Sequence, residues 1–125
     1  AAPGLVSAAE AVLRGEDPDP AIFADAAAGL RNQPGGADID TVVLACTHFP
    51  LVERQLAEHL VPILGRDVRF VHGAEGIARR VAHLTAGQPF LRKEPDFALF
   101  TGDADQFSTL RPALQARGLQ EIRAF

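Results

Sequence analysis

The chain has 125 residues, of which 47% are hydrophobic and 22% are charged, and this composition is typical of a globular domain with a core. Its net charge of −4 and the scattering of its 12 lysines and arginines argue against a nucleic-acid-binding surface. No apolar run approaches the roughly 20 residues of a membrane span, and the single cysteine excludes an internal disulfide and favours a cytoplasmic protein. The sequence contains no Met, so we expect it to be a fragment of a longer gene product.

Two helices are predicted before the first strand. Apolar residues recur at helical spacing from Gly4 to Leu13. A second helix is predicted from Pro20 to Arg31, because Asp19 is a suitable N-cap and proline suits the first helical position. A loop rich in proline and glycine follows at residues 34–36.

The first predicted strand is short and rich in β-branched residues. Residues 41–45 carry no charge, which is typical of a strand buried on both faces in a parallel sheet. A turn at residues 46–50 leads into a helix predicted over residues 50–60. The buried stripe of this helix is expected to contain Val52, Leu56 and Leu60.

The second half of the chain continues to alternate between strands and helices. Strands are predicted at residues 68–71, 97–100 and 119–125, and helices at residues 74–85 and 104–116, the latter interrupted at Pro112. The helix over residues 74–85 is expected to bury Ile77, Val81 and Leu84. This order indicates an α/β fold, with a mostly parallel sheet flanked by helices and right-handed crossovers.

Polar side chains follow the first strand at the place where open α/β sheets bind ligands, beyond the carboxyl ends of the strands. Cys46, Thr47 and His48 lie in this turn. A thiol beside a helix N-terminus is a suitable base or nucleophile, and a nearby imidazole can share its proton. The threonine offers a hydroxyl and a backbone N–H to an anion. The residues alone leave an alternative open, in which the cysteine packs in the core and the other two cap the helix.

The other histidines are weaker candidates for a functional site. His72 ends a predicted strand at the same edge of the sheet, whereas His59 and His83 lie within helices and are expected to be packing or surface residues. The spacing of the histidines and the lack of a second cysteine argue against a zinc site. No glycine-rich phosphate loop is present in the sequence.

Residues 40–51 read Asp-Thr-Val-Val-Leu-Ala-Cys-Thr-His-Phe-Pro-Leu and resemble the second cysteine motif of bacterial glutamate racemases. Residues 3–10, 73–81 and 100–107 resemble further motifs of that family in the same order, so the resemblance covers nearly the whole chain. It implies two α/β lobes with a pseudo-twofold relation and the active site between them. Residues 1–87 would belong to the cysteine-bearing lobe, residues 88–96 would form a linker, and residues 97–125 would return to the other lobe.

The resemblance implies a cofactor-independent racemase that interconverts L- and D-glutamate and supplies D-glutamate for peptidoglycan, and hence for cell shape. Two cysteines on opposite faces of the substrate act as base and acid at the α-carbon, and no metal takes part. Cys46 matches the second of these cysteines, Thr47 would bind the substrate, and His48 and Glu10 would assist the cysteine. The implied partners are glutamate, the missing N-terminal half of the enzyme and a second copy in a homodimer.

The chain departs from the family's pattern in three places. The N-terminal half with the first cysteine is absent, Ala2 stands where many members have a cysteine, and His72 and Gly73 replace a common Asp-Ser pair. Three alternatives therefore stay open: a racemase for aspartate or a related amino acid, a truncated non-catalytic homologue that acts as a binding or regulatory module, and a fragment without independent function. The last alternative predicts exposed apolar faces that the missing lobe would cover.

Overall fold

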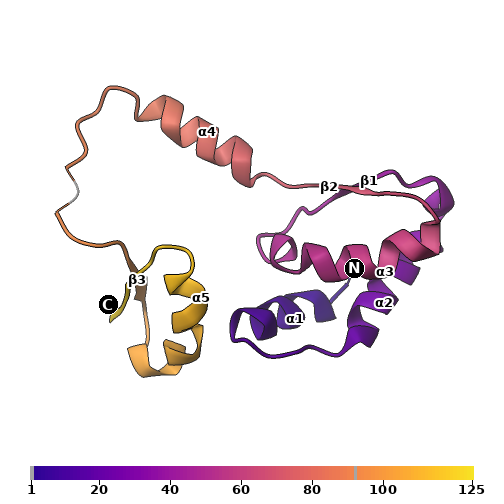
Figure 1. Cartoon of the computed structure of the whole chain (residues 1–125), viewed down its shortest axis with the longest axis horizontal. Helices are drawn as coiled ribbons and strands as arrows, with labels where there is room; N and C mark the ends of the chain where they lie inside the picture. Colours follow the sequence, from indigo (N-terminus) through magenta and orange to yellow (C-terminus); the bar gives the residue numbers. More distant parts are fainter. Residues whose placement is uncertain (1, 92) are drawn as a thin grey trace.

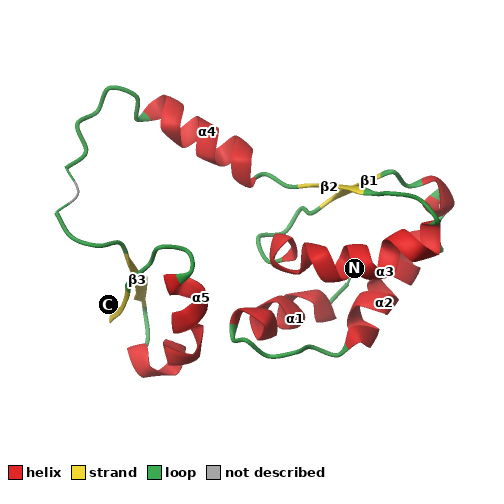
Figure 2. Ribbon diagram, in the orientation of Figure 1, coloured by secondary structure: helices red, strands yellow, loops and turns green. Residues whose placement is uncertain are grey.

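The computed structural model describes residues 2–91 and 93–125, so Ala1 and Arg92, which fall in the predicted lobe segment and linker, lie outside the described residues. Helices and strands alternate along the chain as the sequence predicts, and the fold is a mixed α/β fold with parallel strands (Figures 1 and 2). The elements are α1 (Gly4–Leu13), α2 (Pro20–Arg31), η1 (Gly36–Asp38), β1 (Thr41–Val43), η2 (Phe49–Val52), α3 (Glu53–Leu64), β2 (Arg69–Val71), α4 (Ala74–Leu84), β3 (Phe97–Phe100), η3 (Ala104–Leu110), α5 (Arg111–Gln115) and β4 (Glu121–Ala124).

The strands of the described residues form two small sheets. In one, β1 pairs in parallel with β2, with Val42 opposite Phe70; in the other, β3 pairs in parallel with β4, with Ala98 opposite Ile122. Parallel pairing of this kind needs a crossover between the strands, which α3 provides for the first sheet and η3 with α5 for the second. The predicted parallel α/β architecture is therefore confirmed.

The hydrophobic core lies where α2 packs on α3 and α1 packs on α2 and η2, and Val42 of β1 packs against it; Figure 1 shows the three helices gathered together. Its buried side chains come from all three helices and from the segments on either side of the turn after β1. They are Leu5, Ala8, Ala9, Phe23, Leu44, Val52 and Leu56. Leu60 is also buried, so the predicted stripe of α3 is confirmed. The core fixes the end of α1 beside the turn after β1, which matters for the site below.

The N-terminus of α2 follows the predicted capping pattern. The carboxylate of Asp19 accepts a hydrogen bond of 2.9 Å from the backbone N–H of Ala21, and Pro20 occupies the first helical position, where no backbone donor is needed. The side chain thereby satisfies one of the backbone N–H groups that every helix leaves unpaired at this end.

Replacing Asp19 with alanine is expected to lower the free energy of unfolding by about 1 kcal/mol, the usual cost of losing a side-chain cap. Chemical denaturation of the 125-residue chain measures this loss. Asp17→Ala removes the same charge without touching the cap and is expected to change the stability much less. Equal losses in the two variants would show that the charge, and not the cap, is responsible.

Two expectations about burial are wrong. Ile77, Val81 and Leu84 of α4 are 67%, 54% and 59% exposed, because no element in the described part of the chain buries the apolar stripe of this helix. Val43 of β1 is 67% exposed, because the helices of the core cover only one face of its sheet. The helix predicted over residues 104–116 is interrupted at Pro112 as expected, because proline suits the first turn of the new helix α5, but the part before it is the 3₁₀ stretch η3 and not an α-helix.

The helix predicted over residues 50–60 also differs at both ends. It begins as the 3₁₀ turn η2 and continues as α3 to Leu64, where Gly65 adopts a left-handed conformation with φ of 65° and ends the helix. None of the helices in the described part of the chain has the length and apolar character that a membrane crossing requires.

Candidate active site

Cys46 lies in the turn between β1 and η2. The backbone N–H of Leu44 still donates to the carbonyl of Val71 in the sheet, at 2.8 Å, and after it the chain leaves the sheet. The N–H of Phe49 then donates to the carbonyl of Cys46, at 3.2 Å, and closes the turn. The thiol is half-buried. The sequence indicated that Cys46 lies beside the N-terminus of an α-helix. In the structure α3 begins only at Glu53, and the 3₁₀ turn η2 separates the cysteine from it.

His48 is the centre of the group of predicted site residues. Its Nδ1 lies 3.9 Å from the Sγ of Cys46 and 3.5 Å from the Oγ1 of Thr47. Its Nε2 lies 3.7 Å from the Oε1 of Glu10, which comes from α1. The structure therefore brings all four predicted residues together, although one of them is far away in the sequence. The imidazole stands between a thiol and a carboxylate.

The carboxylate of Glu10 also has a cation on its other side. Its Oε2 lies 3.9 Å from the Nη1 of Arg14, whose Nε donates to the Oε1 of Glu16 at 2.9 Å. The hydrogen bond to Glu16 is the main reason that the pKa of the Arg14 guanidinium is raised. The side chains of Glu10 and His48 are 51% and 35% exposed, so water screens these contacts and each is weak by itself.

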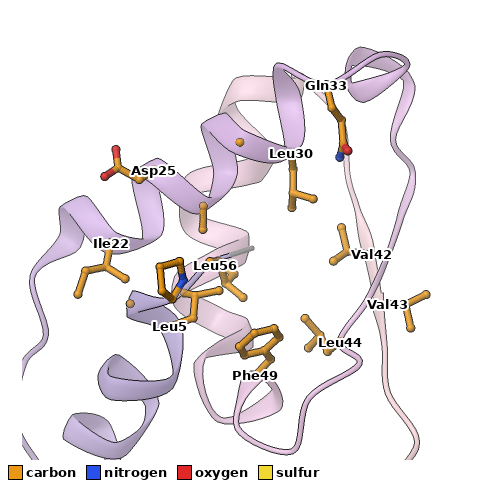
Figure 3. A pocket seen from close by; sticks show the side chains of 15 residues that line it. Leu5, Ile22, Asp25, Leu30, Gln33, Val42, Val43, Leu44, Phe49 and Leu56 are labelled. Carbon is orange, nitrogen blue, oxygen red and sulfur yellow. The ribbon is translucent and has the colours of Figure 1, made fainter.

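This arrangement suits proton transfer. A thiol, an imidazole and a carboxylate in line can pass a proton away from the sulfur and share the charge that remains. The site is open to solvent in the described residues, because the side chains of Glu10 and His48 are partly exposed and Cys46 is only half-buried. A cavity of about 500 Å³ lies between α1, α2 and β1; Leu44 and Phe49 line it, but neither Cys46 nor His48 does (Figure 3).

The other candidates from the sequence have local structural contacts. The Nδ1 of His72 accepts a hydrogen bond of 3.3 Å from the backbone N–H of Ala74 at the start of α4. The Nδ1 of His59 lies 2.9 Å from the carbonyl of Gln55, and its ring lies 5.9 Å from that of Phe23. Among the described residues, no cluster of His, Cys, Asp and Glu side chains is arranged to hold a metal ion.

Comparisons with known proteins point to one family. The chain is 56% identical over 100 residues to the glutamate racemase of Sphingopyxis alaskensis. This match covers 79% of this chain and 36% of that protein. It is 36% identical over 124 residues to the glutamate racemase of Serratia proteamaculans, and this match covers 95% of this chain and 40% of that protein. No protein-family model matches the chain.

A solved structure has the same fold. The chain superimposes with a TM-score of 0.76 and 29% identity on Escherichia coli glutamate racemase in complex with L-glutamate and the activator UDP-MurNAc-ala, over 96% of this chain and 44% of that one. The chain thus spans about two-fifths of the length of the relatives it matches. In sequence and in fold, the chain therefore belongs to the glutamate racemase family, and it corresponds to part of the length of its members.

Proposed function

We propose that the full-length protein containing this chain interconverts L- and D-glutamate without a cofactor, by proton transfer at the α-carbon. The observation that carries this proposal is the line of contacts from Cys46 through His48 to Glu10, in a chain that is 56% identical to a glutamate racemase. The Escherichia coli enzyme of the same fold binds L-glutamate, which supports glutamate as the substrate here. The product D-glutamate would serve peptidoglycan synthesis.

In this proposal Cys46 is the acid or base on one face of the substrate. As a thiolate it removes the α-proton of one enantiomer, and as a thiol it returns a proton to the carbanion formed from the other. His48 and Glu10 take up and release the proton between turnovers, since the imidazole contacts the sulfur through Nδ1 and the carboxylate through Nε2. Thr47, at the same edge, binds the substrate through its hydroxyl and backbone N–H.

The opposite face of the substrate needs a second acid or base, and Cys46 is the single cysteine of this chain. We propose that the rest of the polypeptide supplies a second cysteine and excludes water from the half-buried thiol. In this arrangement residues 1–87 belong to one lobe, residues 88–96 form a linker, and residues 97–125 return to the other lobe. Two copies of the complete protein form the predicted homodimer.

The proposal is tested in a hybrid racemase, in which this chain replaces the segment that it matches in the Sphingopyxis alaskensis enzyme. Proton NMR in heavy water follows exchange at the α-carbon, and optical rotation follows inversion. Exchange and inversion of glutamate support the proposal. Activity on aspartate alone would indicate the related racemase instead. A folded hybrid that exchanges neither amino acid would overturn the catalytic assignment and favour a binding or regulatory module.

Glu10→Gln in the hybrid racemase is expected to lower kcat about tenfold, a modest loss for an acid–base group because the contact with His48 is half-exposed. The amide keeps the shape of the side chain but removes the negative charge beside the imidazole. Glu16→Gln is the matched control, since Glu16 contacts Arg14 but has no contact with His48. Comparable losses of kcat in both variants would contradict a specific role for Glu10.

A further inference from the structure

The proposed proton path depends on where the carboxylate of Glu10 points. The Oε1 of Glu10 lies 3.7 Å from the Nε2 of His48, which is longer than a hydrogen bond, and the side chain is 51% exposed. A long side chain of this kind loses rotamer freedom when it is held in one place, so a single weak contact does not fix it. A second contact that restrains the carboxylate raises the fraction of molecules in which it faces the imidazole.

Arg14 makes such a contact from the end of the same helix. It is the C-cap residue of α1, and its backbone N–H donates to the carbonyl of Glu10 at 3.1 Å. The spacing of four residues puts the two side chains on one face of the helix. The Nη1 of Arg14 lies 3.9 Å from the Oε2 of Glu10, whereas the Oε1 faces His48. The carboxylate therefore has a guanidinium beside one oxygen and an imidazole beside the other.

The guanidinium of Arg14 is itself held by the turn that ends α1. Gly15 adopts a left-handed conformation with φ of 79°, and the backbone N–H of Glu16 donates back to the carbonyl of Ala11 at 2.9 Å. This turn brings the carboxylate of Glu16 beside Arg14. Its Oε1 accepts from the Nε of Arg14 at 2.9 Å, and its Oε2 accepts from the Nη2 at 3.5 Å. The Nη1 is thereby left on the side of Glu10.

We propose that Arg14 is a positioning residue of the site, whose guanidinium, held by Glu16, restrains the carboxylate of Glu10 so that its Oε1 faces His48. The proposal rests on the proposed function, because Arg14 affects the reaction only through Glu10. An arginine keeps its charge at any pH at which the protein is folded, so the restraint does not depend on its own titration. Both side chains are partly exposed, so water screens the contact and its effect is modest.

Arg14→Gln in the hybrid racemase is expected to lower kcat about threefold, the size of effect that one partly exposed ion pair has. The melting temperature is expected to stay nearly unchanged, because the substitution lies at the surface. Arg54→Gln is the matched control, since it breaks an exposed ion pair of the same spacing, with Glu58 on α3. An unchanged kcat in Arg14→Gln, or an equal loss in Arg54→Gln, overturns the proposal.

A double-mutant cycle separates a role through Glu10 from a general structural role. Residues that act through one contact are not additive, whereas independent ones are. In the Glu10→Gln background of the hybrid racemase, Arg14→Gln is therefore expected to cause no further loss of kcat. The same threefold loss in both backgrounds would show that Arg14 acts on the enzyme by another route, and it overturns the proposal.

The restraint on Glu10 can also be measured without turnover. In the 125-residue chain, three-bond NMR coupling constants report the rotamers of the Glu10 side chain. One rotamer is expected to dominate, and Arg14→Gln is expected to give couplings averaged over the staggered rotamers. Glu16→Gln is the control, because its amide oxygen still accepts from the Nε of Arg14 and keeps the guanidinium in place. Couplings that Arg14→Gln leaves unchanged overturn the proposal.

The two proposals fail in different ways. If the hybrid racemase neither exchanges nor inverts glutamate while Arg14→Gln still averages the Glu10 couplings, the proposed function fails and the restraint by Arg14 stands. If the hybrid inverts glutamate and Arg14→Gln changes neither kcat nor the couplings, the proposed function stands and Arg14 is not a positioning residue. Averaged couplings without a loss of kcat in an active hybrid also overturn the positioning role.

Discussion

Replacing Cys46 with alanine in the hybrid racemase is expected to lower the rate of glutamate inversion about 10³-fold or more, the range that a positioned acid or base contributes. The thiol is the one group of the site that touches the α-carbon in the proposed mechanism, and alanine supplies no acid or base in its place. Slow exchange of the α-proton is expected to persist for one enantiomer, without inversion, because the acid or base on the opposite face is unchanged. Proton NMR in heavy water separates exchange from inversion.

The stability of this variant is its control. Cys46 is half-buried and lies outside the core cluster, so alanine is expected to leave the melting temperature nearly unchanged. A loss of inversion accompanied by unfolding would say nothing specific about the thiol. Retention of inversion by a folded Cys46→Ala variant would contradict the assignment of the cysteine as acid or base and would move that role to His48.

Replacing Gly36 with alanine is expected to destabilise the 125-residue chain by about 3 kcal/mol, at the upper end of the usual cost of overpacking. Gly36 is buried at the start of η1, and a Cβ atom there would collide with the backbone carbonyl groups of Leu30 and Arg31 at the end of α2. Backbone atoms of a helix cannot move aside as a flexible side chain can. Chemical denaturation measures the loss.

Gly35→Ala is the matched control for this substitution. Gly35 has open space around its Cα atom, but its φ of 76° lies in the left-handed region. Alanine at this position is expected to cost only about 1–2 kcal/mol, the strain of that conformation for a residue with a Cβ atom. If the two variants lose the same stability, the collision at Gly36 has been relieved by movement of the loop, and the expected difference is wrong.

Capping residues and apolar periodicity were sufficient to predict the start of α2 and the buried face of α3. Asp19 and Pro20 marked the start of α2, and the stripe of Val52, Leu56 and Leu60 marked the buried face of α3. Capping and periodicity act within one turn or one face of a helix, so they can be recognised without knowledge of the fold. The order of strands and helices likewise predicted the parallel pairing.

The same patterns gave no correct prediction where the burial or position of a side chain depends on another element of the fold. The stripe of Ile77, Val81 and Leu84 has the pattern of a buried face, yet the described chain provides nothing to cover it. The position of Glu10 beside His48 also could not be read from spacing, because the packing of α1 against η2 determines it. Only the resemblance to a known family connected these two residues before the structure did.

The sheet of β3 and β4 lies outside the core cluster, and this separation affects how the chain is expected to unfold. Every residue of that cluster lies between Leu5 and Leu56, and β3, β4 and α5 contribute no buried side chain among the described residues. Denaturation of the 125-residue chain is therefore not expected to be all-or-none. Fluorescence or exchange probes placed in the helical cluster and in the last sheet should report separate midpoints, and a calorimetric enthalpy should exceed the van't Hoff value. The losses expected for Asp19→Ala and Gly36→Ala belong to the first of these transitions alone.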